Sequence, residues 1–369
     1  MNPEETVIFT NCHTHTFTHK HSPDRFVPPP LNYLLRIGVI RRAVLAFGHW
    51  FDPKRKGAIG RYAEILETSY DKDQEAIFRR LQSFYPEGTR FVVLPMDMEF
   101  IGLGGLEESV DVQHDELHAL ARKNPDTLIP FAAVDARRGK LGVDKAIERL
   151  QSGFRGIKLY PPIGYHPYDR NLWALYDWAA EQTPTVPVLT HCSRPASVQF
   201  HGVPTREMQT DPETGEVGNR GRFELLTWFT DPDSYRTLLT RWPNLRVCLA
   251  HFGGAGDWGR YLDKPWDSST DATEKSWLAK IADMIRSGEY PNLWTDIAYT
   301  LFADDEYVYL LKTLLSDERI LDRTLFGSDF YVVESARLEE RRRSVRIRAV
   351  LGEALFTKIA VENPKEFLG

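Results

Sequence analysis

Residues 7–15 read VIFTNCHTH, an apolar run that leads directly into two histidines. Side chains alternate between the two faces of a β-strand, so His13 and His15 are expected to point the same way where such a strand ends. Neutral imidazole is a common ligand of zinc and its neighbours, although a single His-X-His pair also occurs as an ordinary surface or core feature. The meaning of this pair therefore depends on what the rest of the chain brings to it.

Seven more apolar runs, each bounded by turn residues, follow the first predicted strand, VIFTNC (7–12). They are RFVVLPM (90–96), LIPFAAV (128–134), FRGIKLY (154–160), VPVLTH (186–191), LRVCLAH (245–251), NLWTDIA (292–298) and TLFGSD (324–329). Most are separated by segments with helical periodicity, such as DELHALARKN (115–124) and RNLWALYDWAAEQ (170–182). Near-continuous apolar strands that alternate with helices are typical of a parallel sheet, and eight such units predict an α/β fold of the (β/α)8 TIM-barrel type.

A doubly wound open sheet is the main alternative fold. That fold usually carries a glycine-rich phosphate-binding loop after its first strand. Here the first strand runs into HTHTFTHKH (13–21) instead. The prediction is therefore a single barrel domain over residues 1–369.

Several connections between strands are longer than a barrel requires. Residues 16–88 form the longest insertion, and within it residues 31–51 read as an amphipathic helix suited to a lid or a dimer contact. Long loops that follow the strands of a barrel lie over its active face. We therefore expect segments 16–60, 192–222 and 253–275 to cover that face.

The composition excludes several classes of protein. Lys and Arg total 46 against 52 Asp and Glu, a formal charge of -6 that argues against binding nucleic acid through its phosphates. The start, MNPEETVIF, lacks the pattern of a secretory signal, and arginines interrupt segment 31–51 too often for a membrane span. Three cysteines are too few for a disulfide framework and predict a reducing, cytoplasmic setting: Cys12, Cys192 and Cys248.

Titratable side chains recur at the carboxyl ends of the predicted strands. After the first strand with His13 and His15 come Lys158 on the fourth, His191 on the fifth, His251 on the sixth and Asp329 on the eighth. Taken singly, each has an ordinary explanation as a capping or core residue. Because all strand ends of a barrel share one mouth, the set as a whole predicts a site for one or two divalent ions.

This order of residues resembles the amidohydrolase superfamily of metal-dependent barrels, and most closely its amidohydrolase-related (amidohydrolase 2) branch. The matching stretches are NCHTH, GFRGIKLYPP, VPVLTHC, PNLRVCLAHFGG, NLWTDIA, TLFGSDF and ENPKEFLG. The resemblance implies that His13, His15, His191 and Asp329 hold one divalent ion, zinc before manganese. It also implies that Asp329 accepts the proton of a metal-activated water, while His251 polarises the substrate carbonyl.

The chemical state of Lys158 decides whether the site holds one metal ion or two. In the superfamily a lysine at this place can be carboxylated and bridge two ions, which would make His191 and His251 ligands of the second ion. A free ammonium has no lone pair to donate, so an unmodified Lys158 would instead bind a substrate carboxylate. Further candidates for substrate binding are Tyr160, Arg194 and Trp258.

The resemblance implies a metal-dependent hydrolase of a small amide, ester or lactone. One alternative is a metal-dependent, non-oxidative decarboxylase of an aromatic or muconate-type acid, because members of the same branch use similar ligands. A second alternative is a barrel that binds ligand without chemistry. The partner expected in each case is a small, anionic molecule rather than nucleic acid or a membrane, and a homo-oligomer is left open.

Overall fold

The sheet of this protein contains eight strands that are all parallel and lie in chain order. It is seen in a computed structural model that describes residues 8–26, 37, 72–194, 198–263, 275–330 and 340–369. The strands are β1 Thr10–Thr14, β2 Arg90–Val93, β3 Leu128–Ala133, β4 Gly156–Leu159, β5 Val188–Thr190, β6 Val247–Leu249, β7 Leu293–Asp296 and β8 Thr324–Leu325. Seven of them lie within the predicted runs, and β1 overlaps the predicted run 7–12 but continues to Thr14, so the eight predicted strands are confirmed.

The first strand meets the chain segment that follows the eighth. The backbone N–H of Cys12 donates to the carbonyl of Phe326 at 2.9 Å, and that of His15 donates to Phe330 at 2.7 Å. In the opposite direction, the N–H of Asp329 donates to the carbonyl of His13 at 2.9 Å. These bonds nearly close the sheet into a barrel, as predicted, and they bring the first and last predicted site residues together.

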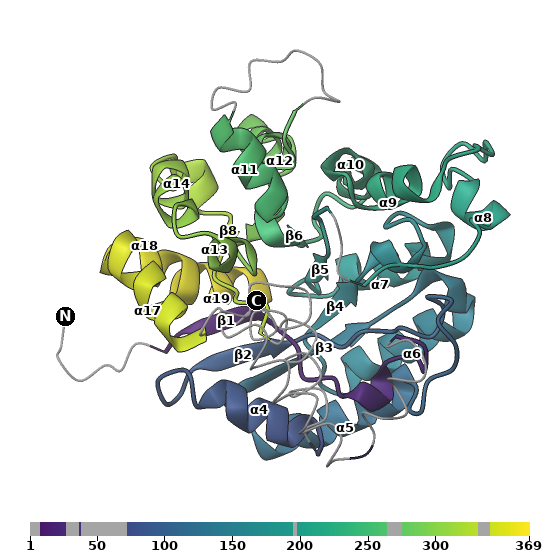
Figure 1. Cartoon of the computed structure of the whole chain (residues 1–369), viewed down its shortest axis with the longest axis horizontal. Coiled ribbons are helices and arrows are strands. Elements are labelled where there is room, and N and C mark those ends of the chain that lie inside the picture. Colours follow the sequence, from purple (N-terminus) through teal and green to yellow (C-terminus); the bar gives the residue numbers. More distant parts are fainter. Residues whose placement is uncertain (1–7, 27–36, 38–71, 195–197, 264–274, 331–339) are drawn as a thin grey trace.

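Helices surround the barrel and follow one another in chain order around its outside (Figure 1). The longer ones are α4 Gln74–Gln82, α5 Val110–Lys123, α6 Gly139–Gln151, α7 Trp173–Glu181, α9 Arg222–Thr230, α11 Ala255–Asp263, α12 Trp277–Ser287, α14 Tyr307–Leu314 and α17 Glu340–Leu351. The shorter ones are α8 Arg206–Gln209, α10 Arg236–Arg241, α13 Thr300–Ala303, α15 Glu318–Leu321, α18 Glu353–Thr357 and α19 Asn363–Leu368.

Helix α12 shows how the sequence sets these elements. The side chain of Ser276 accepts a hydrogen bond from the backbone of Ala279 at its start, and Gly288 ends it with a left-handed φ of 71°. Lys280 lies on this helix, largely buried, and donates to both Asp231 and Asp233 at 2.7–3.0 Å. The helix is therefore fixed by its caps and by the two ion pairs of one largely buried lysine.

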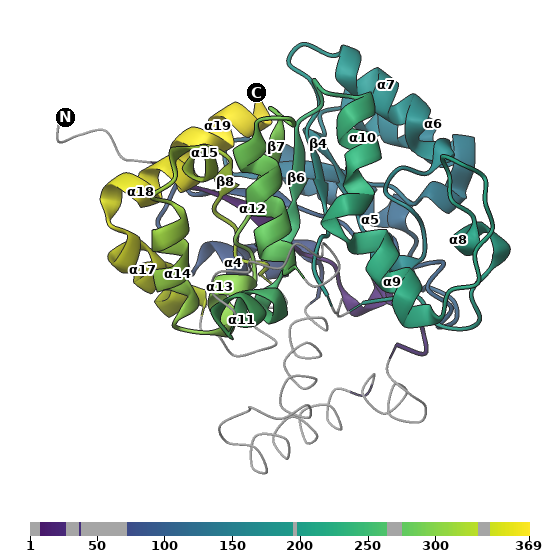
Figure 2. The ribbon, with the colours of Figure 1, turned by 90° about the horizontal axis from the view of Figure 1, so that it is seen from above.

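Of the three apolar clusters among the described residues, the two that include residues of the barrel strands form its cores. The larger one lies between the strands and the surrounding helices, and the smaller one fills the barrel with side chains such as Val92, Phe131 and Leu189. Phe367 and Leu368 of α19 belong to the smaller core, with the ring of Phe367 at 5.7 Å from that of Trp294. Helices α19 and α11 lie at opposite ends of the barrel (Figure 2), so α19 closes the end that is remote from the predicted site.

Some predictions concern segments that are described only in part. Most of the insertion 16–88, including nearly all of 31–51, lies outside the described residues, so its role as a lid or dimer contact stays a prediction. Segments 192–222 and 253–275 are described except for 195–197 and 264–274. The three cysteines are free and buried, and no helix among the described residues is long and apolar enough to cross a membrane.

Candidate metal centre

The carboxyl ends of five strands bring the predicted site residues to one mouth of the barrel. All are buried: His13, His15, Lys158, His191, His251 and Asp329. Imidazole rings from three strands lie in series, because the ring centroid of His251 is 4.9 Å from that of His13 and 4.7 Å from that of His191. The shared mouth that the sequence predicted is thus present in the structure.

A β-bulge in β1 changes the direction in which the side chains around His13 point. The pairing of β1 with β2 shifts between Asn11 and Thr14, where three steps along β1 match two along β2. As a result Cys12 lies in the barrel core, although simple alternation would place it on the face opposite His13. The bulge lets Cys12 fill the interior while His13, its neighbour, still reaches the mouth.

Hydrogen bonds fix which nitrogen of each β1 histidine carries the proton. Nδ1 of His15 lies 2.6 Å from the carbonyl oxygen of Leu94, and Nδ1 of His13 lies 2.9 Å from the Oδ2 of Asp296. A carbonyl or a carboxylate only accepts, so both Nδ1 atoms must donate. Burial, reinforced by the charge of Lys158, lowers the pKa of His13 well below 6.5, so this ring is neutral and its Nε2 has a lone pair.

Three acceptor atoms therefore face one another at the mouth. Oδ1 of Asp329 lies 3.2 Å from Nε2 of His15 and 3.6 Å from Nε2 of His13. Two imidazole nitrogens and a carboxylate oxygen, all within 4.8 Å of one another, fit a divalent cation such as zinc or manganese.

The two remaining histidines form a pair beside this group. Nδ1 of His251 donates to the carbonyl of Ala298 at 3.0 Å, so Nε2 of His251 accepts from Nδ1 of His191, also at 3.0 Å. The Nε2 of His191 in turn accepts from the hydroxyl of Ser193 at 3.0 Å. Three of the four predicted ligands of a single ion thus converge, whereas His191 lies with His251, as the two-metal version expects.

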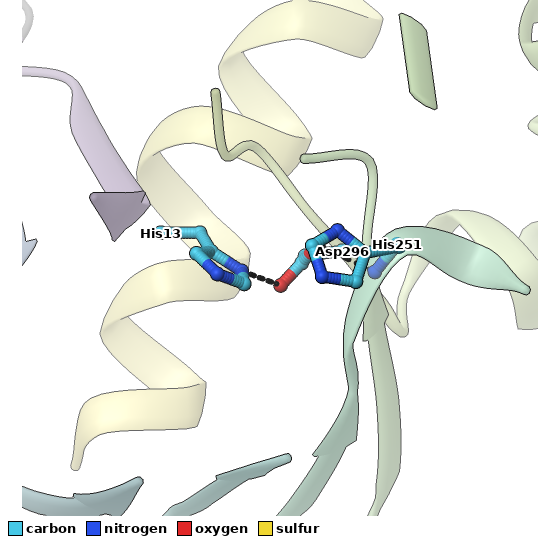
Figure 3. Close-up of side chains that lie close together, drawn as sticks. All are labelled: His13, His251 and Asp296. Carbon is cyan, nitrogen blue, oxygen red and sulfur yellow. Dashed lines mark hydrogen bonds and ion pairs between the residues drawn. The ribbon is translucent and has the colours of Figure 1, made fainter. Parts of the chain in front are cut away.

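Asp296 is a buried carboxylate that the sequence reasoning missed. It ends β7, within the quoted stretch NLWTDIA, and lies between His13 and His251 (Figure 3). A titratable side chain at the carboxyl end of a strand was the criterion that selected the other residues, and the same criterion would have found this one.

Two of the site residues have unusual backbone conformations. His251 has a φ of 69° and Asp329 a φ of 63°, a left-handed region that residues other than glycine seldom adopt. Such strain costs on the order of 1–3 kcal/mol per residue and persists only where the surroundings enforce it. Hydrogen bonds to neighbouring strands hold both conformations: the N–H of His251 donates to Asp296, and that of Asp329 donates to the carbonyl of His13. Strain that is held in this way is typical of functional sites.

Lys158 has no hydrogen-bond partner among the described residues, although it is only 1% exposed. Burial lowers its pKa from 10.5 to about 8. Its Nζ lies 5.9 Å from the ring centroid of Tyr160, whose ring is 4.7 Å from that of His191. A buried amine without a partner in this place fits either of its predicted roles, carboxylation or binding of a substrate carboxylate.

The other predicted substrate contacts are placed less favourably. Trp258 is 0% exposed, and its indole N–H donates to the carbonyl of Phe252 at 2.9 Å, so packing accounts for its position and its role in substrate binding stays a prediction. The amphipathic helix α11 turns this side chain inward. Arg194 donates to both oxygens of the buried Asp257 at 3.0 and 3.1 Å, which explains its position without a substrate. Its role as a substrate clamp stays a prediction.

A second group of potential ligands does not fit a metal. His21, Glu108 and Glu116 also lie within metal-binding distance of one another. However, the backbone N–H of Thr18 donates to Nδ1 of His21 at 3.0 Å, and burial lowers the pKa of His21 to about 4. In the neutral ring the proton is then on Nε2, the atom that faces Glu108, so no lone pair is available there.

The fold and the site together define a (β/α)8 barrel with a buried histidine and aspartate centre at the carboxyl ends of its strands. A family model described as Amidohydrolase matches residues 103–369, more than half of the chain, so the protein belongs to the amidohydrolase family. That family generally uses a divalent metal, which agrees with the acceptor atoms at the mouth. No curated protein sequence matches the chain.

Solved structures with the same fold include enzymes of two reaction types. A 5-carboxyvanillate decarboxylase from Novosphingobium aromaticivorans, complexed with manganese and a nitrobenzoic acid, has a TM-score of 0.55 and 16% identity, covering 100% of this chain and 97% of that chain. A probable 2-pyrone-4,6-dicarboxylic acid hydrolase from Acinetobacter baumannii has a TM-score of 0.53 and 12% identity, covering 98% and 99%. At such identities the likeness shows the fold alone.

Proposed function

We propose that this protein is a metal-dependent hydrolase of a small ester, lactone or amide that bears a carboxylate. The observation that carries the proposal is the convergence of three acceptor atoms: Nε2 of His13, Nε2 of His15 and Oδ1 of Asp329. Each can offer a lone pair to a metal ion. A bound divalent ion would supply an activated water at neutral pH and polarise a carbonyl oxygen. Zinc is our first choice, because it accepts this mixture of nitrogen and oxygen ligands, and manganese is the alternative.

Three side chains at the mouth have predicted roles in the reaction besides holding the ion. Asp329 would accept the proton of the attacking water and pass it to the leaving group, since its carboxylate lies at the mouth beside Nε2 of His13 and Nε2 of His15. The predicted role of His251, stabilising the negative charge that develops on the carbonyl oxygen, needs an N–H directed at the substrate, whereas here its Nδ1 donates to Ala298 and its Nε2 accepts from His191. Lys158, which lacks a partner among the described residues, would bind the carboxylate of the substrate and orient it.

Non-oxidative decarboxylation of an aromatic acid is the second candidate. It is favoured by the aromatic ring of Tyr160, which lies beside His191 and close to the amine of Lys158. This arrangement suits a flat substrate whose carboxylate is directed at Lys158. The solved decarboxylases are similar in fold, and at their low identity they do not decide the reaction.

One screen separates the two reactions. Protein loaded with zinc, and separately with manganese, is incubated with carboxylated lactones and esters and with hydroxylated aromatic acids, while hydrolysis products and carbon dioxide are both measured. We expect hydrolysis without carbon dioxide. Release of carbon dioxide without hydrolysis would establish the second candidate, and the absence of both reactions and of bound metal would leave a barrel that only binds ligand.

A further inference from the structure

The two carboxylate oxygens of Asp296 bind two different predicted site residues at the mouth, His13 and His251. Asp296 is the last residue of β7 and is 0% exposed. Its Oδ2 accepts from Nδ1 of His13 on β1 at 2.9 Å. Its Oδ1 accepts from the backbone N–H of His251, which follows β6, at 2.9 Å, and from that of Ala298 at 3.0 Å.

The bond to His13 determines which nitrogen of that ring is free. With its proton held on Nδ1 by Asp296, the ring presents the lone pair of Nε2 to Asp329. Without an acceptor at this position the proton could move to Nε2, and the ring would then present a donor. His15 is independent of Asp296, because its Nδ1 is fixed by the backbone carbonyl of Leu94.

The bonds to the backbone hold His251 in its left-handed conformation. In addition to Asp296, the hydroxyl of Thr300 donates to the carbonyl of His251 at 2.7 Å, and Nδ1 of His251 donates to Ala298. The strained residue is therefore fixed on its amide, its carbonyl and its ring. Figure 3 shows the carboxylate of Asp296 between the rings of His13 and His251.

We propose that Asp296 is a positioning residue that sets the metal-binding form of His13 and, through its other oxygen, the backbone of His251. One carboxylate thereby couples the ligand of β1 to the histidine of β6. The inference rests on the proposed metal centre in so far as it concerns metal affinity. The position of the proton on His13 is a property of the metal-free protein and can be measured without any enzymatic activity.

The variant Asp296→Asn tests this coupling with little change in shape. The amide oxygen of the asparagine can still accept from the backbone of His251 and Ala298, so the local backbone should be retained. Its NH2 group would then face Nδ1 of His13, which must become an acceptor, and the proton of the neutral ring moves to Nε2. The variant should therefore fold but present a donor to the metal.

Two readouts check this expectation. In metal-free protein with 15N-labelled histidine, NMR should show His13 protonated on Nδ1 in the wild type and on Nε2 in Asp296→Asn, with His13→Gln used to assign the resonance. Competition with a chromogenic chelator should show zinc bound about 10–100-fold more weakly by Asp296→Asn. The matched control is Asp135→Asn, a buried carboxylate beyond β3 that binds Arg137 instead of a histidine, and it should keep the zinc affinity of the wild type.

Each outcome decides one of the two proposals. Equal zinc affinity and an unchanged proton position in Asp296→Asn would overturn the positioning role. If that variant does not fold, the wild-type spectrum still decides, because a metal-free His13 protonated on Nε2 contradicts the inference. If the wild type binds no zinc at all, the proposed metal function fails, whereas the proton position still tests the role of Asp296.

Discussion

At the scale of single residues, the chemistry of this site depends on where three histidine protons lie. His13, His15 and His21 each have an acidic neighbour, yet only the first two have an acceptor at Nδ1 and therefore a free lone pair at Nε2. The partner of Nδ1 thus separates a group that fits a metal from one that does not. This difference is not visible in the spacing of histidines along the sequence.

The proton-accepting role of Asp329 leads to the first prediction. In Asp329→Asn the side chain keeps its shape but cannot accept a proton, so kcat/KM should fall roughly 10²–10⁴-fold. His13→Ala should be inactive as well, because it removes a metal ligand. The control is Cys192→Ala, whose buried thiol donates to the carbonyl of Thr230, and it should retain activity. Turnover that is preserved in Asp329→Asn would remove the proton-transfer assignment.

The buried amine of Lys158 predicts a dependence of stability on pH. Its pKa is 10.5 in the unfolded chain and about 8 in the folded protein. Between these values the unfolded chain binds a proton that the folded chain does not, so the folded state gains stability as the pH rises. Urea unfolding of metal-free protein should show the stability of the wild type, relative to Lys158→Met, rising by roughly 3 kcal/mol over this window.

The control for this prediction is an exposed lysine. Lys140 is 85% exposed, so Lys140→Met should show no such trend across the same range of pH. A difference between wild type and Lys158→Met that stays flat from pH 8 to 10.5 would mean that the folded protein binds the proton of Lys158 as readily as the unfolded chain does.

At the scale of elements, the strands could be predicted and their local irregularities could not. Each strand is buried on both faces, which gives a short apolar run that is readable from the sequence. The bulge in β1 was not predicted, because NCHTH is also compatible with simple alternation. Helix α11, which lies within segment 253–275, was not predicted either, because the spacing between strands gives the length of a connection and not its secondary structure.

The contact between β3 and β4 gives a prediction at this scale. Gly156 pairs with Phe131, and a Cβ atom at this position would lie 2.3–2.7 Å from atoms of the phenylalanine ring. Gly156→Ala should therefore overpack the barrel and lower the free energy of unfolding by about 1–3 kcal/mol. Gly105→Ala is the control, because nothing lies within 4 Å of the added atom, and it should be neutral or slightly stabilising in urea unfolding.

At the scale of the whole molecule, the barrel has the candidate metal centre at one end and helix α19 across the other. The class of fold and the common mouth followed from counting strands and noting what stands at their carboxyl ends. The convergence of His13 and His15 with Asp329 also followed, because closure of a barrel places its first and last strands side by side. The pairing of His191 with His251 and the role of Asp296 depend on side-chain hydrogen bonds, which no sequence pattern specifies.

The packing of helix α19 against the barrel core leads to a prediction about global stability. Phe367 is fully buried against Trp294 in the barrel core, although it belongs to the last helix. Phe367→Ala should leave a cavity and reduce the free energy of unfolding by about 3–5 kcal/mol in urea denaturation. Phe223→Ala is the control, because that ring is 77% exposed and its loss should change stability by less than about 0.5 kcal/mol. Equal effects of the two changes would contradict the conclusion that α19 closes this end of the barrel.

The proposed metal centre is tested most directly by anomalous X-ray diffraction from crystals of the zinc-loaded protein. The account predicts an anomalous peak bound by Nε2 of His13, Nε2 of His15 and the carboxylate of Asp329, each at about 2.0–2.2 Å. A second peak between His191 and His251 would establish two ions, and its absence would establish one. A peak at His21 and Glu108 alone, or no peak at the barrel mouth, would contradict the account.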